Sequence, residues 1–524
     1  MGVPRTIERD PIRRLEALPF GRWHRVLIVL VGIGSFFDLY EVFLGGVLAP
    51  VLAQQWTLSS NEKAWVIASG FFGMFAGAAL MSPLADRWGR RRVFMLNLVF
   101  YAAFSLASAF SPNLAVFGVL RFVAGLGMGA ELVLVDTYLA EFMPARIRGR
   151  SISWAYVVGF LGVPLAALLG ARVVAKHTIA GMAGWRWLLI AGALGALFVW
   201  LARRGLPESP RWLLSRGRAE EAERVVAEIE AKVAASGVAG TAAAATAATA
   251  DAAATADASV PAARASGGAV PEAVLEAEAA QVRKVAFRDM FRGEYQRRTV
   301  MLWIFQILQT VGYYGFGSLA PVVLTAKGYS VTSSLGYAAL SFMGYPIGAL
   351  VATPLVERFE RKALIIGSAV AIAVLGLVFG FSRETALIVA AGFLLTVSSN
   401  VFSNAFHVYQ TEIFPTAVRS TAIGAAYSLS RLVSGVLPFV ALTVLDHFGA
   451  GWVFAGSAVL MGLLCLDVAV LGPRTTGRSL EEVTEVPAAA FAPPAAAPAD
   501  PAADAPAADA PVGGDSADAS ATVD

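Results

Sequence analysis

The sequence predicts an all-α membrane protein in which twelve transmembrane helices form two pseudo-symmetric bundles of six. Three observations support this prediction: the composition, twelve long apolar stretches and an internal repeat. Of the 524 residues, 57% are hydrophobic and only 15% are charged, whereas a soluble protein carries roughly 25% charged residues. The excess of apolar residues requires a non-aqueous environment, which excludes an ordinary soluble enzyme.

The twelve apolar stretches are the predicted membrane helices, because about 20 apolar residues cross the hydrocarbon core of a bilayer. They run over 26–52, 64–85, 93–111, 114–140, 151–172, 186–203, 300–326, 331–356, 363–382, 385–411, 420–445 and 450–471. The alternative, a large soluble core, would need all twelve helices to be apolar on every side and to approach bilayer length. The first stretch is too long for the core of a signal peptide, so we expect it to remain uncleaved.

The distribution of lysine and arginine predicts the orientation of these helices. Runs of basic residues lie at 13–14, 87–92, 146–150 and 358–362, and alternate connections carry few. Loops rich in lysine and arginine stay in the cytoplasm. We therefore expect a multi-pass protein of the cell (inner) membrane with both termini cytoplasmic.

An internal repeat divides the chain into two halves. Leu48-Ala49-Pro50-Val51 recurs as Leu319-Ala320-Pro321-Val322, and Asp86-Arg87 recurs as Glu357-Arg358. The copies are 271 positions apart, as 357 is from 86, and this offset holds without a gap from 48 to 148. Two parallel six-helix copies are an architecture of secondary transporters, whose binding site lies near the midplane between the halves.

The segments outside the two bundles are polar or of low complexity. The predicted divisions are a cytoplasmic N-terminal segment, an N-terminal bundle, a central cytoplasmic loop, a C-terminal bundle and a cytoplasmic tail, at 1–25, 26–203, 204–299, 300–471 and 472–524. The loop begins as an amphipathic helix near 218–224 and turns into Ala, Thr, Gly and Ser from 233 to 270, so we expect partial disorder. The tail from 486 is rich in Ala and Pro and resembles a solvated extension.

Several motifs resemble the major facilitator superfamily. The loop Asp86-Arg87-Trp88-Gly89-Arg90-Arg91-Arg92 is similar to its hallmark motif. Three further elements resemble its sugar-porter and organic-ion (niacin-type) branch. They are Arg121-x-x-x-Gly125-x-Gly127 running on to Tyr138-x-x-Glu141-x-x-Pro144-x-x-x-Arg148-Gly149, then Pro207-Glu208-Ser209-Pro210-Arg211-Trp212-Leu213, and finally Glu412-x-x-Pro415-x-x-x-Arg419. A last motif at 477–482 also matches, although Arg474 stands where the branch has an acidic residue. The resemblance implies the major facilitator fold.

The resemblance also implies a cytoplasmic gate, in which ion pairs between helix ends hold the outward-open state and break when the cytoplasmic side opens. Exposed ion pairs contribute about 0–1 kcal/mol each, which suits contacts that must separate. The alternative is that these charges only fix the topology. The gate residues are Asp86, Arg87, Gly89, Arg90, Glu141, Arg148, Glu208, Arg211 and, in the second half, Glu357, Arg361, Glu412 and Arg419.

Ionisable residues inside the apolar stretches predict a proton-coupling site. Asp38 and Glu41 lie within about 60° of each other on one helix face, and Arg121 of the fourth stretch is expected to meet that face. Burial favours the neutral carboxyl group and a nearby arginine favours the carboxylate, so a moving arginine makes a carboxyl group bind and release a proton. Proton symporters of the branch carry an aspartate in helix 1 and this arginine. The alternative is a fixed, structural Asp38–Arg121 pair.

The substrate prediction rests on the seventh stretch, which departs from the hexose-porter pattern. Leu308-Gln309 replaces the usual Gln-Gln, and Tyr314 replaces an asparagine. Arg431, a cation in the middle of the eleventh stretch, suits a carboxylate. We therefore expect a small organic carboxylate, with a sugar or polyol as the alternative. The predicted substrate residues are Tyr40, Gln309, Tyr313, Tyr314, Asn400, Asn404, His407 and Arg431.

Other classes of function find little support in the sequence. The single cysteine, Cys465, cannot form an internal disulfide, and the four histidines lack metal-ligand spacing, so we expect no metal and no cofactor. The net charge of +3 argues against a nucleic-acid partner, and no nucleophile–base motif of an enzyme is present. The expected partners are a small molecule, protons and the lipid bilayer, and the chain is expected to act as a monomer. A transporter-like sensor remains the more distant alternative.

Overall fold

The computed structural model of this chain describes residues 11–129, 131–144, 147–174, 178–235, 293–414 and 416–473. All of them belong to one unit, Met1–Thr484. The low-complexity part of the predicted loop and nearly all of the predicted tail lie outside the described residues. So do the side chains of Asp86, Glu357 and Arg419.

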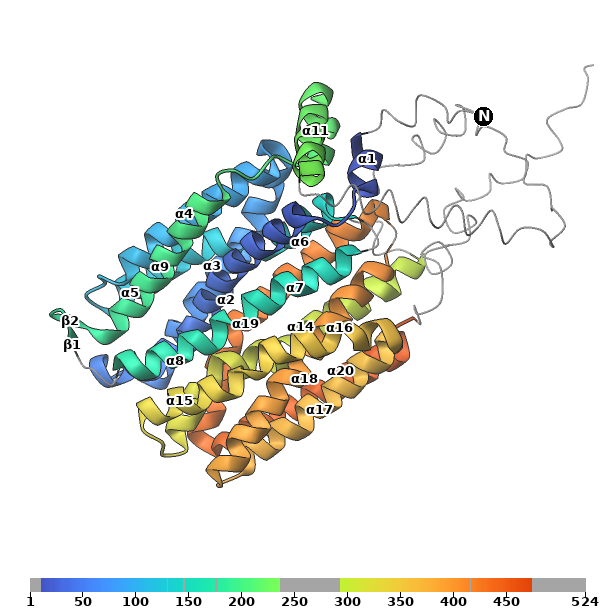
Figure 1. Cartoon of the computed structure of the whole chain (residues 1–524). Coiled ribbons are helices and arrows are strands. Elements are labelled where there is room, and N and C mark those ends of the chain that lie inside the picture. The colour runs from blue at the N-terminus through green and yellow to red at the C-terminus, as the bar shows by residue number, and fades with distance from the viewer. Residues whose placement is uncertain are drawn as a thin grey trace, which may run out of the picture. The chain divides into compact units, whose positions relative to one another are not determined.

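The first half of the described chain is helical apart from one short hairpin (Figure 1). Its helices are α1 (Pro11–Ala17), α2 (Arg22–Trp56), α3 (Ser60–Trp88), α4 (Arg90–Ser108), α5 (Leu114–Met128), α6 (Glu131–Phe142), α7 (Arg148–Phe160), α8 (Gly162–Val174), α9 (Gly184–Arg203), α10 (Pro210–Ser215) and α11 (Ala219–Ala235). The antiparallel strands β1 (Thr178–Ile179) and β2 (Met182–Ala183) join α8 to α9.

The second half is helical throughout the described residues. Its helices are α14 (Gly293–Ala326), α15 (Val331–Phe342), α16 (Gly344–Arg358), α17 (Arg361–Phe381), α18 (Thr385–Glu412), α19 (Thr416–Phe448) and α20 (Ala450–Leu471). Each of the twelve predicted stretches therefore coincides with one long helix or with two consecutive helices, which confirms the twelve-helix prediction.

Ten spans in the described residues are long and apolar enough to cross a membrane. The other two of the twelve stretches correspond to α4 and to α5 with α6. Helix α4 begins with three arginines at 90–92, which lower its hydropathy, and α5 is only 15 residues long. Helix α6 continues the same stretch but carries Glu131, Asp136 and Glu141. These charged residues lower the hydropathy of the stretch.

Local sequence signals set several helix ends. Asn113 accepts a hydrogen bond from the Val116 N–H at 3.0 Å and caps α5. Ser209 caps α10 in the same way and is followed by Pro210 at the first helical position. Gly89 lies between α3 and α4 with a φ of +104°, a conformation that favours glycine.

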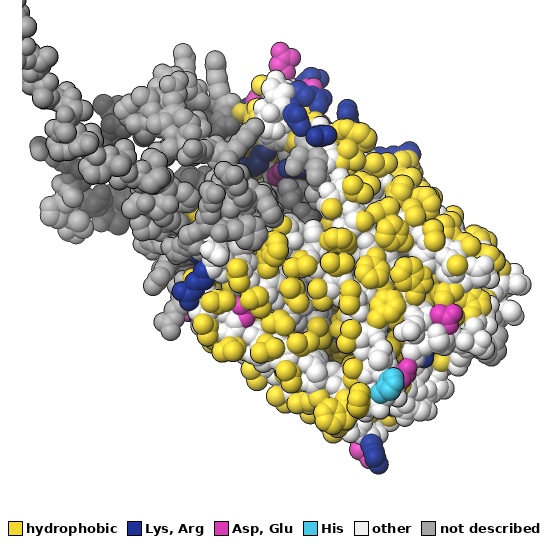
Figure 2. All heavy atoms as spheres, turned by 180° about the vertical axis from the view of Figure 1, so that it is seen from behind, with side chains coloured by type: hydrophobic (Ala, Val, Ile, Leu, Met, Phe, Trp, Pro, Cys, Tyr) yellow, Lys and Arg dark blue, Asp and Glu magenta, His cyan; other side chains and the backbone are white. Residues whose placement is uncertain are grey.

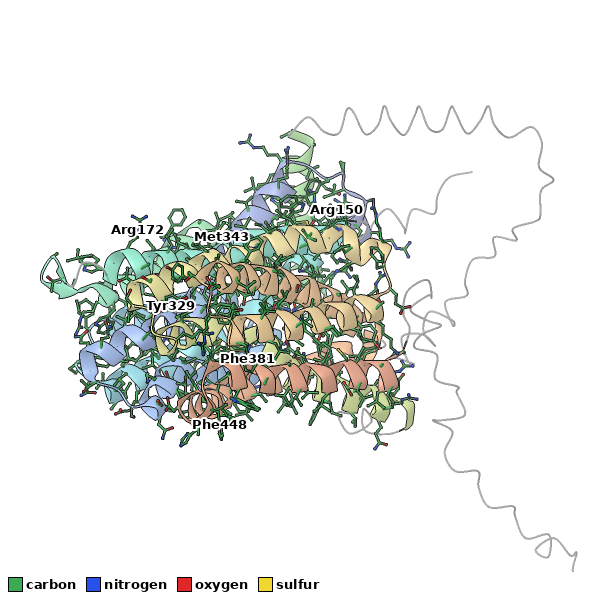
Figure 3. All side chains as sticks on the ribbon, turned by 90° about the horizontal axis from the view of Figure 1, so that it is seen from below. Arg150, Arg172, Tyr329, Met343, Phe381 and Phe448 are labelled. Carbon is green, nitrogen blue, oxygen red and sulfur yellow. The ribbon has the colours of Figure 1, made fainter. Side chains whose placement is uncertain are left out.

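The outer surface of the bundle is apolar, as a lipid-facing surface must be. Hydrophobic side chains cover most of the face in Figure 2, and the Lys and Arg side chains gather mainly at one end. Met343, Phe381 and Phe448 are among the large apolar residues with 41%, 59% and 67% of their surface exposed (Figure 3). Arg150 and Arg172, near the two ends of the α7–α8 stretch, lie at opposite ends of the bundle in Figure 3.

We name the end at which α2 begins and α20 ends the basic end, because the arginines of 87–92 and 148–150 lie there, and the opposite end the far end. Helices α1 and α11 lie at the basic end (Figure 1), and both pack against α10 and against each other. The β1–β2 hairpin lies at the far end.

The contacts between the halves are symmetric in the way that the sequence repeat implies. Helix α2 packs against α14, α3 against α19, and α7 and α8 against α16 and α15. The offset of 271 relates α2 to α14, α3 to α15 and α16, and α7 and α8 to α19. The α3–α19 contact is therefore the symmetry mate of the contact that α7 and α8 make with α15 and α16. This arrangement is the pseudo-symmetry that the repeat predicts.

Candidate functional site

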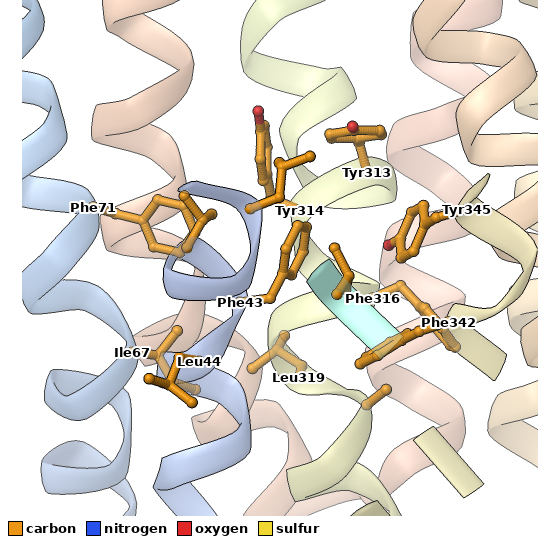
Figure 4. Close-up of a cluster of buried hydrophobic side chains, with 14 of the residues drawn as sticks. Phe43, Leu44, Ile67, Phe71, Tyr313, Tyr314, Phe316, Leu319, Phe342 and Tyr345 are labelled. Carbon is orange, nitrogen blue, oxygen red and sulfur yellow. The ribbon is translucent and has the colours of Figure 1, made fainter. Parts of the chain in front are cut away.

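Aromatic side chains from both halves form a layer where the halves meet (Figure 4). The ring of Phe43 on α2 lies 6.3 Å from that of Tyr314 on α14 and 5.9 Å from that of Tyr345 on α16. Phe160 on α7 stacks on Tyr345 at 5.5 Å, and Tyr313 contacts Tyr314 edge-on at 4.7 Å. The predicted substrate residues Tyr313 and Tyr314 therefore lie at the interface between the bundles.

The guanidinium group of Arg431 lies next to this layer. Its Cζ is 4.5 Å from the ring centroid of Tyr314 and 4.6 Å from that of Tyr427, whose hydroxyl accepts a hydrogen bond from Nη2. The residue is 1% exposed, and Nη1 has no hydrogen-bond partner among the described residues. None of the ion pairs in the described part of the chain includes Arg431. A buried cation of this kind favours an anionic partner.

The predicted amide residues bond mainly within the second half. Asn400 donates to the Tyr345 carbonyl oxygen at 2.7 Å, and Asn404 donates to the Asn400 carbonyl oxygen at 2.9 Å. Gln309 donates to the side-chain oxygen of Gln306 at 2.9 Å. These amide hydrogens are therefore engaged by the protein itself, which leaves fewer donors for the many hydroxyl groups of a sugar.

Two further predicted residues lie in different places. The hydroxyl of Tyr40 donates to the Leu188 carbonyl oxygen at 2.9 Å, inside the first half. His407 on α18 lies across the interface from Tyr156 on α7, with 6.3 Å between ring centroids. Its Nδ1 is 3.3 Å from the side-chain nitrogen of Gln410.

The predicted proton-coupling residues lie inside the first half. Arg121 forms an ion pair with Glu41, and its Nη2 donates to the Glu41 carbonyl oxygen at 3.1 Å. Ser105 on α4 donates a second hydrogen bond to the same carboxylate. The two oxygens of Asp38 are buried and have no hydrogen-bond partner among the described residues. The structure therefore pairs Arg121 with Glu41, whereas the structural alternative in the sequence analysis paired it with Asp38.

A second buried ion pair was not predicted. Arg203, the last residue of α9, donates to Glu131 on α6 at 2.9 Å, and both side chains are completely buried. Sequence reasoning placed Arg203 at the boundary of an apolar stretch, where arginine commonly faces water. The missed signal is Gly34, because a Cβ atom there would overlap Nη2 of Arg203. The absent side chain makes room for the guanidinium group inside the bundle.

The predicted gate residues that the structure describes lie at the basic end. Arg90 lies 3.7 Å from Glu141, and the repeat-related Arg361 lies 3.4 Å from Glu412, between ion-pair atoms. Each ion pair joins helices of one half. It therefore holds together the basic end of its own bundle and does not connect the two bundles.

The other described gate residues link the segments on either side of the first bundle, α1 and the stretch from α9 to α10, to that bundle and to each other. Glu208 accepts a hydrogen bond from the Arg91 backbone N–H at 3.0 Å, beside Gly89. Arg148 and Arg211 both contact Glu16 of α1, at 3.3 and 2.5 Å. Arg14 of α1 pairs with Glu223 and Glu230 of α11, contacts that the sequence analysis did not foresee. Arg87 is exposed.

The described residues contain no group of three or more His, Cys, Asp and Glu side chains that could hold a metal ion. A cavity of about 120 Å³ lies in the second half between α14, α17, α19 and α20. Its lining is almost entirely apolar and includes Gly312, Gly376 and Phe454. No charged group lines this cavity, so Arg431 and the aromatic layer form the better candidate site.

Three comparisons with known proteins agree with this architecture. The model of the family described as Sugar (and other) transporter matches residues 27–486. The niacin transporter NiaP of Acinetobacter baylyi is 30% identical over 475 residues, covering 90% of this chain and 99% of that protein. The inner membrane metabolite transport protein YdjE of Escherichia coli is 26% identical, covering 90% and 98%. The partially occluded inward-open structure of the xylose transporter XylE from E. coli superimposes with a TM-score of 0.65 at 22% identity, covering 87% and 99%.

Proposed function

We propose, from the premise that this chain belongs to the sugar (and other) transporter family of the major facilitator superfamily, that it moves a small organic carboxylate by proton symport. Members of the family are transporters rather than enzymes, and the substrate is a small metabolite. The carboxylate and the proton are the parts that we propose.

One observation carries the carboxylate proposal: Arg431 is a buried cation without an ion-pair partner among the described residues. A guanidinium group binds a carboxylate through two parallel hydrogen bonds. Because Nη1 has no partner and Nη2 donates to Tyr427, an incoming carboxylate would complete the hydrogen bonding of the group. Arg431 and the aromatic layer lie near the interface between the halves, and the substrate sites of such transporters lie between the halves as well, which supports the proposal.

The aromatic layer supports a flat substrate. Tyr314 lies against Arg431 and is in ring contact with Phe43 and Phe71 of the first half. Aromatic rings stack favourably on a planar ring, and a substrate there touches both halves. The relative NiaP is named for niacin, a flat ring that carries one carboxylate.

Ligand binding to the purified protein tests this proposal. Nicotinate and benzoate are expected to raise the melting temperature, and nicotinamide, which has the same ring without the charge, is expected to have little effect. Xylose and sorbitol belong in the same screen, because a response to these alone would replace the carboxylate with a sugar or polyol. Uptake of the labelled ligand into proteoliposomes then separates a transporter from a sensor, which would bind without transport.

The proton proposal rests on Asp38. Its carboxyl group is 1% exposed and has no hydrogen-bond partner among the described residues, whereas Glu41 is held by Arg121 and Ser105. A buried carboxylate without hydrogen bonds is unfavourable, and protonation removes the charge. Asp38 is therefore the proton carrier, and Glu41 with Arg121 forms the fixed partner pair.

We place the basic end in the cytoplasm, with both termini there and the chain in the inner membrane. The positive charge at this end supports the orientation, and the relative YdjE is named an inner membrane protein. The gate then lies on the cytoplasmic side, where Arg90–Glu141 and Arg361–Glu412 stabilise the two bundle ends. A single chain holds both halves of the site, so a monomer is sufficient for transport.

A further inference from the structure

We propose that Arg203 is a movable counter-ion shared by Glu131 and Asp38, and that the proton moves from Asp38 to Glu131 when Arg203 changes partner. This inference rests on the proton symport proposed above. It adds a second carboxyl group, nearer to the basic end, as the group that passes the proton on.

Within the bundle, Arg203 contacts a carboxylate, a backbone carbonyl group and an aromatic ring. Nη1 of Arg203 donates to Glu131 at 2.9 Å, and Nη2 donates to the Val31 carbonyl oxygen at 3.1 Å. The Arg203 Cζ lies 4.0 Å from the ring centroid of Phe94. One oxygen of Glu131, Oε2, is buried without a hydrogen-bond partner among the described residues. The pair is therefore fixed through one carboxylate oxygen, and the second is available to accept a proton.

The two ion pairs flank Asp38 along one face of α2. Positions 31, 34, 38 and 41 follow each other at steps of three and four, the spacing of neighbours on one helix face. Arg203 contacts this face at Val31 and Gly34, and Arg121 contacts it at Glu41. Asp38 lies between them, one helical turn or about 6 Å along the axis from Gly34. Arg203 is thus already positioned one turn from Asp38.

The buried group of acids and arginines needs one bound proton to be electrically neutral. Three carboxyl groups, Asp38, Glu41 and Glu131, face two guanidinium groups, Arg121 and Arg203, and all five residues are at most 2% exposed. Among the described residues, the other titratable group that acts on Asp38 is the Tyr101 hydroxyl of α4, and a phenol is uncharged at neutral pH. With every acid ionised, the group would hold one uncompensated negative charge, which burial strongly disfavours. One bound proton makes the group neutral.

The partner of Arg203 decides which acid holds this proton. While Arg203 bonds Glu131, as in this structure, Asp38 is the acid without a cation and keeps the proton. When Arg203 turns to Asp38, the O–H bond of Asp38 breaks and a new O–H bond forms at Oε2 of Glu131. The total charge stays at zero in both arrangements. Because Val31 and Gly34 precede Asp38 along α2, the proton advances toward the basic end.

Proton-driven uptake in proteoliposomes tests the proposal with two variants and a control. Wild type in a gradient of one pH unit is expected to accumulate substrate about tenfold if one proton accompanies each molecule. E131Q leaves two acids and two arginines, so no proton is needed, and accumulation is expected to vanish while counterflow exchange continues and loses its pH dependence. The control is D467N on α20, a buried carboxyl group of the second half without a hydrogen-bond partner among the described residues, which is expected to accumulate as wild type does.

The double variant E131Q/R203Q separates this role from a purely structural one. It removes one charge of each sign and leaves Asp38 with a proton that it has no acid to pass to, so accumulation is again expected to vanish. Normal accumulation by E131Q or by the double variant overturns the proposal. If both fail to fold, R203K decides: it keeps the charge on a shorter ammonium group that lacks the guanidinium fork and its reach to two partners, so the pH profile of counterflow is expected to shift, and an unchanged profile contradicts the role of Arg203.

The same experiments distinguish this inference from the function on which it rests. Wild type that takes up substrate without any proton uptake refutes proton symport, and the present inference with it. Wild type that is coupled, with D38N uncoupled and E131Q fully coupled, refutes only the role of Glu131 and Arg203.

Discussion

At the scale of single residues, the structure separates charges that the sequence grouped together. Asp38 and Glu41 lie on one face of α2, but only Glu41 is paired with Arg121. Spacing along a helix shows that two side chains share a face, whereas their partners come from segments far away in the sequence. For the same reason Arg203 was missed, since its partner Glu131 and the space beside Gly34 belong to other helices.

Asp38→Asn is expected to abolish proton-driven accumulation and to spare counterflow exchange. An amide cannot carry the proton, but it fits the same space, and the remaining two carboxylates still balance two arginines. The measurement is uptake of labelled substrate at an imposed pH gradient, with counterflow from preloaded vesicles as the control. Accumulation at the wild-type level would exclude Asp38 as the proton carrier.

Arg431→Gln is expected to weaken carboxylate binding by about 2–5 kcal/mol, the usual effect of removing one member of a buried charge pair. This corresponds to at least a roughly 30-fold higher Kd. Isothermal titration with wild type and variant measures the change, and nicotinamide serves as the neutral ligand for comparison. An unchanged Kd for nicotinate would remove Arg431 from the substrate site.

At the scale of helices, composition and length were sufficient to predict all twelve spans. A span must be about 20 apolar residues long, and this requirement is visible without tertiary contacts. The breaks were not visible: α7 and α8 are separate helices around Leu161, and α15 and α16 around Met343. Such breaks depend on packing against neighbouring helices, which local hydropathy does not report.

The α2–α14 contact provides a test at this scale. A Cβ atom at Gly46 would overlap the Ser318 carbonyl oxygen, a backbone atom that has little freedom to move. Gly46→Ala is therefore expected to destabilise the protein by about 1–3 kcal/mol, the usual effect of overpacking. Gly456→Ala is the matched control, because a Cβ atom there meets nothing within 4 Å. Thermal unfolding in detergent compares the two, and equal melting temperatures would contradict a close α2–α14 contact.

At the scale of the whole molecule, the repeat predicted two pseudo-symmetric bundles, and the structure adds which helices meet between them. The offset of 271 relates the α3–α19 contact to its symmetry mate once the structure has shown either one. The substrate residues were predicted less completely, since Tyr313, Tyr314 and Arg431 lie near the interface while the hydroxyl of Tyr40 bonds within the first half. The sequence shows which helix carries a residue, and the tilt and rotation of that helix decide what the residue faces.

The proposed orientation predicts that both ends of the chain are accessible only from the cytoplasmic side. Protease-cleavable tags fused before residue 1 and after residue 524 are expected to be cut in inside-out vesicles and protected in right-side-out vesicles. A tag inserted in the β1–β2 turn at 180–181, at the far end, is the control with the opposite pattern. The same protection for all three tags would contradict the orientation.

The repeat also shows how unevenly the two copies are charged. The offset of 271 maps Asp38, Glu41, Arg121 and Glu131 onto Gln309, Gly312, Gly392 and Phe402, none of which is ionisable. On the proposed function, the first copy handles the driving ion and the second copy supplies the cation for the cargo. Cargo choice is then free to diverge in evolution without disturbing the energy source. A chimera that joins this N-terminal bundle to the C-terminal bundle of a relative would therefore transport the relative's substrate and remain coupled to protons.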